Sequence, residues 1–495
     1  MNIASNQDWH QRAKGLSIEG RAYIDGEYVG AASGEIFACI NPANGRHIVD
    51  IASGDAEDID RAVKSARRAF DGWARMGAMD RKRILLKFSE LILANKDELG
   101  LLETLNVGKP ITNSTGGDIP SAANCIAWNA EAVDKFYGEV APGASDMTTL
   151  VVREPLGIVG AVVPWNYPLS MAAWKLGPAL ATGNCVILKP AEQSPLTAIR
   201  IAALATEAGI PKGVLNVVPG FGEKAGRALG LHPDVDCVTF TGSTEVGKLF
   251  LTYSGMSNAK RVSLELGGKS PQIVLADCAS LDDAAKAVAA GIFSNAGQIC
   301  NAGSRLIVED KIKGDLIERV VAIAKDLVPG DPLNPATRLG PVVDSTQLQR
   351  ILQYIDIGQK EGARVVTGGA QVLQDTNGFF IQPTVFDNVA SPMRIAQEEI
   401  FGPVLSAITV SDFDQALQVA NDTIYGLAAS IWTNDLRKAH RAAKALRAGV
   451  VWVNCFDKGS MSAPFGGFKQ SGFGRDKSLH ALEKYTDLKS VWISH

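Results

Sequence analysis

Residues 184–220, NCVILKPAEQSPLTAIRIAALATEAGIPKGVLNVVPG, contain the pattern that decides the fold. Two short apolar runs, CVILK and VLNVV, each end at a proline, as buried strands often do. Between them, residues 194–210 have the apolar spacing of a helix. A strand, a helix and a second strand in this order predict a βαβ unit and a parallel sheet.

Similar runs on both sides extend this pattern. IVGAVVP at 158–164 and CVTFTGS at 237–243 are further candidate strands, so residues 155–265 predict one α/β domain. Apolar runs alternate with helical segments again between 271 and 454, which predicts a second α/β domain. We expect a helix at 58–76 and a longer one from near Asp80, both packed on the first domain.

Two further candidate strands have no obvious partner in the second domain. They are MTTLVVREP at 147–155 and YTDLKSVWISH at 485–495. Strands that cannot complete a sheet within one chain often do so in a neighbouring subunit. This predicts a homodimer or a homotetramer.

Composition bounds the class of protein. A chain of 495 residues, 46% hydrophobic and 21% charged, needs more than one core, and we expect two or three domains. A net charge of −4 and a pI near 6.0 do not favour a nucleic-acid partner, so a small molecule is the expected partner. The first twenty residues lack the layout of a signal peptide, and no apolar run is long enough for a membrane span. The expectation is a cytoplasmic protein without a membrane segment.

The seven cysteines are scattered and never form a C-x-x-C pair, and the six histidines form no H-E-x-x-H motif. Neither a disulfide framework nor a metal site is therefore expected.

Three residues carry candidate chemistry. Cys300 lies among small polar residues in SNAGQICNAGS, where a thiolate would be a strong nucleophile for a carbonyl carbon, although a buried structural thiol would also fit. Glu265 precedes a Gly-Gly turn and is either a general base with a raised pKa or a solvated residue at the end of a strand. Asn166, in VVPWNYPL, can donate its amide N–H to a developing oxyanion or can serve only as a turn residue.

With these motifs in order, the chain resembles the aldehyde dehydrogenase superfamily over nearly its entire length. The similar segments include VPWNYPL, VTFTGSTEVGK, LELGGKSP, NAGQICNAGSR, QEEIFGPV and PFGGFKQSGFGRD. The resemblance implies a Rossmann-type NAD-binding domain at 1–134 and 156–264, a catalytic α/β domain at 265–474, and a small β oligomerisation arm at 135–155 and 475–495.

The resemblance also implies catalytic roles. Cys300 would be the nucleophile, Glu265 the general base, and Asn166 with the backbone N–H of Cys300 the oxyanion hole. Lys175 would support that hole, and Asp476 would stand in a proton-relay position. Many relatives have glutamate at this last position, so the shorter Asp476 puts the relay in question.

The expected cofactor is NAD, with NADP possible. The PGFGEKAG segment is one residue longer than G-x-G-x-x-G, and by the resemblance the pyrophosphate lies at FTGSTEVGK instead, a segment that would otherwise be a simple helix N-cap. Glu192 can bind ribose hydroxyls and would repel a 2′-phosphate, whereas Lys189 could hold one. Without the resemblance, Glu399 would be interpreted as a charged surface residue and Phe401 as an aromatic residue of the core. The implied cofactor contacts are Trp165, Lys189, Glu192, Gly222, Gly226, Phe240, Gly242, Ser243, Glu399 and Phe401.

The resemblance implies that the substrate is an aldehyde that reaches Cys300 through a tunnel. Its implied lining is Tyr167, Met171, Trp174, Phe293, Ile299, Asn301, Asp457 and Phe465. Long stretches look like bacterial γ-glutamyl-γ-aminobutyraldehyde and 4-guanidinobutyraldehyde dehydrogenases of polyamine and arginine catabolism. Asp457, and also Asp118, could attract a cationic tail, but Lys458 and Ser460 depart from the pattern of that branch. Aryl, indolyl and aliphatic aldehydes are therefore the alternative.

Three other readings compete. Oxidation with acyl transfer to CoA or phosphate is disfavoured by Glu265, which favours water as the acceptor. A non-catalytic protein on this fold should lack one of the three residues that carry the chemistry. A thiol hydrolase would need a histidine near Cys300, and no motif supplies one.

Overall fold

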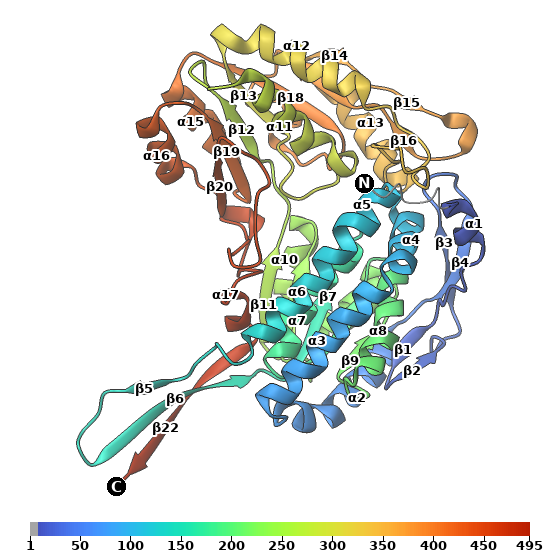
Figure 1. Cartoon of the computed structure of the whole chain (residues 1–495), viewed down its shortest axis with the longest axis vertical. Coiled ribbons are helices and arrows are strands. Elements are labelled where there is room, and N and C mark those ends of the chain that lie inside the picture. The colour runs from blue at the N-terminus through green and yellow to red at the C-terminus, as the bar shows by residue number, and fades with distance from the viewer. Residues whose placement is uncertain (1–7) are drawn as a thin grey trace, which may run out of the picture.

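The computed structural model describes residues 8–495, which fold into two lobes and a projecting arm (Figure 1). The lower lobe in Figure 1 contains an eight-stranded sheet with the order β2-β1-β9-β8-β7-β10-β11-β21. The upper lobe contains a seven-stranded sheet with the order β14-β17-β18-β13-β12-β19-β20. Both are α/β arrangements, as the alternation of strands and helices predicts.

The first sheet is built around five parallel strands. Four of them are buried along their whole length, as expected when helices cover both faces of a parallel sheet, and the fifth, β11, is buried only in its last three residues. The antiparallel strands at its edges are β1 (Ala22–Ile24), β2 (Glu27–Val29) and β21 (Gly472–Phe473). The parallel strands are β7 (Ile158–Val162), β8 (Cys185–Lys189), β9 (Leu215–Val217), β10 (Cys237–Thr241) and β11 (Arg261–Glu265).

All five strands are parallel, but the order in which the chain adds them changes side at β7. From β7 the chain adds β8 and β9 on one side, and it then crosses to the other side of β7 to add β10 and β11. This is the topology of a Rossmann-type sheet, in which ligands bind at the carboxyl ends of the two strands beside the switch. The residues that follow β7 and β10 are therefore expected to face a binding crevice.

The first lobe contains both of the helices that the sequence predicts near the N-terminus. The helix expected at 58–76 is α2 (Ala56–Ala74), which is capped by Asp55. A helix also begins near Asp80, but the prediction that it is longer than the first is wrong. Asn95 ends α3 (Ala78–Ala94) after 17 residues, whereas α2 has 19, and a separate helix follows. The remaining helices of this lobe are α1 (Trp9–Lys14), α4 (Lys96–Val107), α5 (Ile111–Asn113), α6 (Ile119–Ala132), α7 (Pro168–Ala181), α8 (Leu196–Ala208), α9 (Arg227–Leu231), α10 (Thr244–Met256) and α17 (His480–Glu483).

The second sheet has six parallel strands and the antiparallel edge strand β14 (Arg364–Thr367). The parallel strands are β12 (Pro271–Val274), β13 (Arg305–Glu309), β17 (Thr384–Asp387), β18 (Val404–Val410), β19 (Ala428–Trp432) and β20 (Val450–Val453). Its helices are α11 (Leu281–Phe293), α12 (Asp310–Asp326), α13 (Ser345–Lys360), α14 (Arg394–Gln397), α15 (Phe413–Asn421) and α16 (Leu436–Ala445). Two small sheets lie outside both large ones, formed by β3 (Ile36–Ile40) with β4 (His47–Ala52) and by β15 (Gln371–Val372) with β16 (Phe380–Ile381).

The arm is a three-stranded antiparallel sheet that projects from the first lobe (Figure 1). The two strands without a predicted partner pair with each other. They are β6 (Met147–Pro155) and β22 (Thr486–Ser494), matched residue for residue along their whole length, with β5 (Glu139–Ala141) on the other side of β6. The side chains of Val140 and Trp492 remain 74% and 65% exposed on this arm.

Among the described residues, none of the helices combines the length and the apolar character needed to cross a bilayer.

Candidate active site

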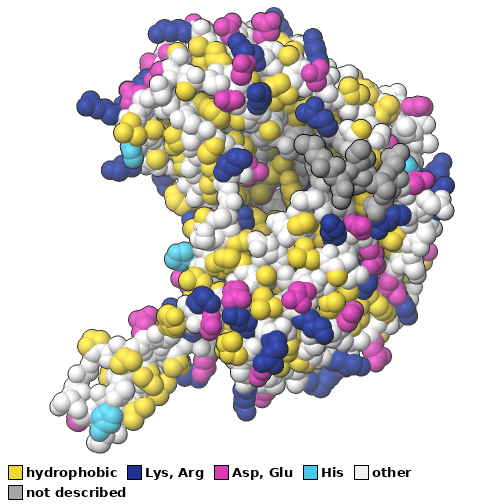
Figure 2. Space-filling view, viewed as in Figure 1, with side chains coloured by type: hydrophobic (Ala, Val, Ile, Leu, Met, Phe, Trp, Pro, Cys, Tyr) yellow, Lys and Arg dark blue, Asp and Glu magenta, His cyan; other side chains and the backbone are white. Residues whose placement is uncertain are grey.

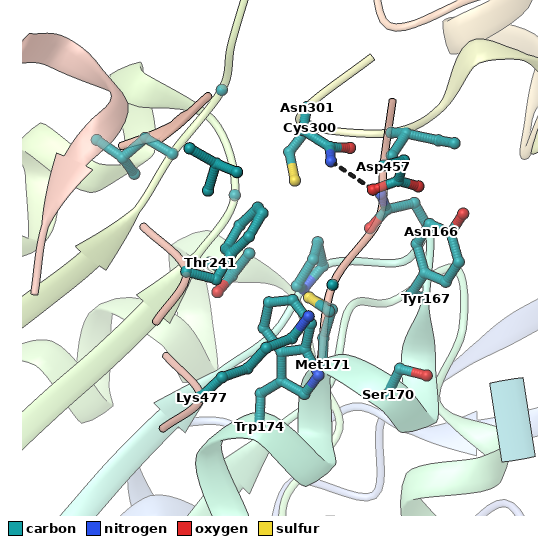
Figure 3. Close-up of a pocket in the computed structure, with 18 of the residues that line it drawn as sticks. Asn166, Tyr167, Ser170, Met171, Trp174, Thr241, Cys300, Asn301, Asp457 and Lys477 are labelled. Carbon is teal, nitrogen blue, oxygen red and sulfur yellow. Dashed lines mark hydrogen bonds between the residues drawn. The ribbon is translucent and has the colours of Figure 1, made fainter. Parts of the chain in front are cut away.

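A cavity of about 500 Å³ lies between the two lobes, and Figure 2 shows this face of the molecule hollowed there. Its walls include the segment that follows β7 and the turn that follows β10, as the switch in strand order predicts. The upper lobe contributes Cys300 and Glu399 to the same cavity. Residues from both lobes therefore face one another across one space (Figure 3).

Cys300 lines this cavity and is partly buried. A tight turn after α11 presents it, with Asn295 and Ala296 held at φ of 49° and 52°, in the left-handed region. Four other cysteines, Cys39, Cys125, Cys185 and Cys237, are buried, so the alternative of a structural thiol suits them and not Cys300. Burial, together with the negative charges of Glu399 and Glu265, raises the pKa of Cys300 to about 12. The thiol is therefore protonated at neutral pH and needs a base before it can attack.

Asn166 connects the first lobe to the loop of the nucleophile. Its side-chain amide donates to the backbone carbonyl of Gln298 at 2.8 Å, and the amide of Asn295 donates to the backbone carbonyl of Asn166 at 3.1 Å. An asparagine amide has two N–H groups, so this contact still allows a second hydrogen bond toward the cavity that Asn166 lines. The arrangement suits an oxyanion donor better than a simple turn residue.

Glu265 is the last residue of β11, and its side chain is 4% exposed. It does not line the cavity itself, and neither carboxyl oxygen has a hydrogen-bond partner among the described residues. Burial, reinforced by the charge of Asp476, raises the pKa of Glu265 well above its usual range. The loop after it lies against the nucleophile, because a Cβ on Gly268 would be 2.5 Å from the backbone carbonyl oxygen of Cys300. Glu265 is thus buried with a raised pKa and is not a solvated residue at the end of a strand.

Lys175 and Asp476 form a fully buried ion pair with 2.6 Å between Nζ and Oδ2. Lys484 contacts the other carboxylate oxygen, so Asp476 lies between two ammonium groups. Burial alone would raise the pKa of Asp476, but the two lysines hold it below its usual range. Its negative charge acts on Glu265, which gives Asp476 an electrostatic role besides the relay that the resemblance implies.

Five of the predicted cofactor residues line the cavity. Ser243 caps α10 by accepting a hydrogen bond from the backbone N–H of Val246 at 3.2 Å, so FTGST is an N-cap as well as part of the cavity wall. Glu399 accepts from the backbone N–H of Gly268 at 3.1 Å, and burial raises its pKa to about 7. The five are Trp165, Gly242, Ser243, Glu399 and Phe401, and the rings of Trp165 and Phe401 meet edge to face at 5.2 Å.

The other predicted cofactor residues lie outside the cavity wall. Lys189, at the end of β8, donates to Glu192 at 3.1 Å. Phe240 packs beneath Gly242, where a Cβ would be 2.4 Å from its ring. Gly222 and Gly226 lie in a short π-helical turn before α9, and a Cβ on either would meet nothing within 4 Å.

Seven of the eight predicted substrate residues line the cavity, and Phe293 does not. The seven are Tyr167, Met171, Trp174, Ile299, Asn301, Asp457 and Phe465. Phe293 is 1% exposed and packs in the core of the upper lobe, because it points inward from the last turn of α11. Asn301 donates to Asp457 at 2.8 Å (Figure 3), which fixes one carboxylate oxygen of that acid.

The sequence analysis missed two lysines at this site. Lys477 lines the cavity. It directly follows Asp476, a predicted site residue, and this adjacency could have indicated that Lys477 lies near the site. Lys109 lies 3.6 Å from the centre of the Tyr167 ring and forms an ion pair with Asp118, a second acid on the cavity wall. The ring of Tyr167 is thereby held in place next to Asn166.

Known proteins match this chain over nearly its whole length. The model of the aldehyde dehydrogenase family matches residues 28–491. The NADP/NAD-dependent aldehyde dehydrogenase PuuC of Escherichia coli is 49% identical over 496 residues, which cover 100% of this chain and 99% of that protein.

Two solved structures are more similar still. The indole-3-acetaldehyde dehydrogenase AldA of P. syringae, a mutant in complex with NAD+ and IAA, is 57% identical with a TM-score of 0.98, and the match covers 99% of both chains. The γ-glutamyl-γ-aminobutyraldehyde dehydrogenase of Burkholderia cenocepacia is 56% identical with a TM-score of 0.97, covering 98% of this chain and 99% of that one.

These matches confirm the resemblance on which the sequence analysis relies, including its branch. The chain belongs to the aldehyde dehydrogenase family.

Proposed function

We propose that the protein oxidises an aldehyde to its carboxylic acid with a nicotinamide dinucleotide, through a thiohemiacetal and a thioester on Cys300. One observation carries this proposal: Cys300 and the amide of Asn166 share a cavity, and the carboxyl group of Glu265 is buried nearby without a hydrogen-bond partner among residues 8–495. A nucleophile, an oxyanion donor and a base are the three parts that covalent oxidation of an aldehyde requires.

The first step is attack on the aldehyde carbon. Cys300 must lose its proton, and the raised pKa of Glu265 makes transfer from a thiol of pKa about 12 less unfavourable than transfer to an ordinary carboxylate. The thiolate then forms a C–S bond, and the carbonyl oxygen becomes an oxyanion. The second N–H of Asn166 and the backbone N–H of Cys300 are placed to stabilise that charge.

Oxidation and hydrolysis complete the cycle. A bound nicotinamide cofactor supplies the acceptor for the hydride that leaves the tetrahedral carbon. The C=O bond re-forms, which leaves an acyl group on the sulfur of Cys300. Glu265 then removes a proton from water as the water attacks the thioester, and the thiolate is the leaving group.

Several residues of this chain fit the cofactor. Ser243, the N-cap residue of α10, lines the cavity, and the free N–H groups and positive dipole end of a helix suit a pyrophosphate. The Lys189–Glu192 pair suits an adenine ribose, and the carboxylate supports a preference for NAD over NADP. Glu399 and Phe401 would lie at the nicotinamide end.

For the substrate, we propose an aminoaldehyde derivative from polyamine or arginine catabolism, supported by the likeness to the γ-glutamyl-γ-aminobutyraldehyde dehydrogenase. The edge-to-face contact of Trp174 and Phe465 at 5.3 Å in the cavity supports the second candidate, an aryl or indolyl aldehyde.

The test is the rate of NADH and NADPH formation with amino-, guanidino-, γ-glutamylamino-, aryl- and aliphatic aldehydes, compared by kcat/KM. Preference for uncharged aromatic aldehydes by more than tenfold would exclude the first candidate. Absence of NAD(P)H formation with every aldehyde would exclude the proposed reaction.

We also propose that the arm mediates assembly into a dimer or tetramer in the cytoplasm. The exposed Val140 and Trp492 on a thin sheet support an interface there, and the seven unpaired cysteines suit a reducing compartment. Light scattering of the wild type and of Trp492→Glu tests the interface. A monomeric wild type, or an unchanged mass for the variant, would contradict it.

A further inference from the structure

The inner wall of the cavity carries an ammonium group that the proposed reaction does not use. Lys477 lines the cavity and is partly buried, and Figure 3 shows its side chain alongside Trp174. Its Nζ is 4.4 Å from the centre of the Trp174 ring and 5.5 Å from that of Phe465. Aromatic faces attract a cation and orient its stem, but they provide no anion.

Lys477 has no ion-pair or hydrogen-bond partner for its ammonium group among the described residues. The three acids that line the cavity are engaged: Asp118 pairs with Lys109, Glu399 accepts from Gly268, and Asp457 accepts from Asn301. A partly buried cation without an ion-pair partner is costly, and burial lowers the pKa of Lys477 more than the charge of Asp457 raises it. A ligand that supplies an anion at this position would remove that cost.

The charges at this end of the cavity favour an anion. Asp457, Lys458 and Lys477 line it together, so two cations face one acid. The ammonium group lies close to the 457–460 loop, since a Cβ on Gly459 would be 4.0 Å from Nζ of Lys477. A purely cationic tail would therefore meet like charge, whereas a carboxylate would meet a free ammonium group.

The backbone of two residues at this end of the cavity adopts a conformation that is unusual for residues with side chains. Lys477 and Asp457 both have left-handed backbone conformations, with φ of 58° and 53°. Such conformations are strained for residues with side chains and concentrate at functional sites. The neighbour of Lys477, Asp476, is fixed by Lys175 and Lys484, which anchors this segment.

We propose that Lys477 determines substrate specificity by binding a carboxylate on the tail of the aldehyde, with Trp174 and Phe465 holding its side chain in position. The inference rests on the proposed oxidation of aldehydes and narrows the substrate to those with an anionic group at the end remote from the carbonyl. An ammonium group on the same tail is tolerated only beside that carboxylate, where Asp457 can receive it.

The test compares aldehydes matched in length that differ in charge. The set is 4-oxobutanoate, its neutral amide 4-oxobutanamide and the cation 3-aminopropanal, with carboxylate and amide homologues extended to seven carbons to cover the reach of the tail. We expect the wild type to prefer the carboxylate over its amide by about tenfold or more in kcat/KM at the best length, mainly through KM, as a charge-assisted hydrogen bond would give.

Two variants of Lys477 and one control isolate the residue. Lys477→Met keeps the apolar stem on Trp174 and should remove the preference for the carboxylate, whereas Lys477→Arg should keep it. Lys311→Met removes the same charge from an exposed residue that does not line the cavity and should leave the carboxylate-to-amide ratio within about threefold.

Two outcomes would overturn the inference: a carboxylate preference that survives in Lys477→Met, or a wild type that prefers the amide or the cation at every length. Both leave the proposed reaction intact, because the amides still report it. Failure of the wild type to form NAD(P)H with any of these aldehydes would instead remove the proposed function.

Discussion

The side-chain amide of Asn166 donates to the backbone carbonyl of Gln298 at 2.8 Å, two residues before Cys300. This bond joins the segment after β7 of one lobe to the nucleophile loop of the other. It fixes the position of the Asn166 amide relative to the Cys300 thiol. The distance between these two groups therefore depends on how the two lobes are arranged. Oxyanion stabilisation is effective only when its donors are positioned in advance.

Replacing Asn166 by alanine should lower kcat about 10²–10³-fold with a much smaller change in KM, because a donor used mainly in the transition state is lost. Steady-state kinetics with a good aldehyde measures this. Asn295→Ala is the matched control: it removes another amide that contacts Gln298 but keeps the proposed donor, and we expect less than about a tenfold loss. Equal losses in the two variants would show that loop packing, and not the Asn166 donor, matters.

The pKa of Cys300 can be tested by alkylation. Glu399 is the carboxylate that contributes most, after burial, to the raised pKa of the thiol. Removing a negative charge favours the thiolate, so Glu399→Gln should shift the pH profile of alkylation of the cofactor-free enzyme to lower pH and speed the reaction at pH 8. Glu398→Gln removes the adjacent carboxylate, which is bound by Arg394 and Tyr354, and should leave the profile in place. A slower reaction of Glu399→Gln would contradict the account.

The buried Lys175–Asp476 pair should contribute to stability. Lys175→Met leaves part of a buried negative charge uncompensated, and removing one partner of such a pair typically costs about 3–5 kcal/mol. Lys64→Met removes one partner of the exposed pair with Asp60 and should cost under about 1 kcal/mol. Denaturant unfolding of both variants at equal protein concentration gives the comparison. A Lys175→Met protein as stable as Lys64→Met would mean that Lys484 alone neutralises Asp476.

Cofactor preference should depend on Glu192. In Glu192→Gln the repulsion of a 2′-phosphate is removed and the ammonium group of Lys189 is released from its partner at 3.1 Å. We expect the ratio of kcat/KM for NADP to that for NAD to rise about tenfold. Glu207→Gln, an exposed change on α8, serves as the control. A ratio that does not rise in Glu192→Gln would place the adenine ribose elsewhere.

Much of the fold follows from the periodicity of the sequence. Strands β7, β8 and β10 lie within runs that end at a proline or glycine, and their burial on both faces produces the continuous apolar signal. Strands β1 to β4 were missed because they are short and, apart from β1, mostly exposed or half-buried, so their alternation is weak. The break between α3 and α4 at Asn95 leaves the apolar spacing almost unchanged, and no glycine or proline marks it.

The candidate site was predictable where a residue type itself implies chemistry. Thiol, carboxyl and amide groups made Cys300, Glu265 and Asn166 candidates, each with a non-catalytic alternative, and the resemblance to a family then assigned their roles. Phe293 and Lys477 were misjudged or missed because the direction of a side chain decides their role: Phe293 points into the core, and a left-handed backbone brings Lys477 to the cavity. Neither direction follows from local sequence.

The most direct test of the central claim is to trap the acyl-enzyme in Glu265→Gln. Water is a far weaker acid than the thiol, so loss of the base should slow hydrolysis more than attack, and turnover should fall about 10²–10⁴-fold. Incubation with NAD and an aldehyde, followed by mass spectrometry of the intact protein and its peptides, should show one acyl group on Cys300 and one NADH per acylated site. Continued product formation without an acylated protein, or an acyl group on any other residue, would contradict the account.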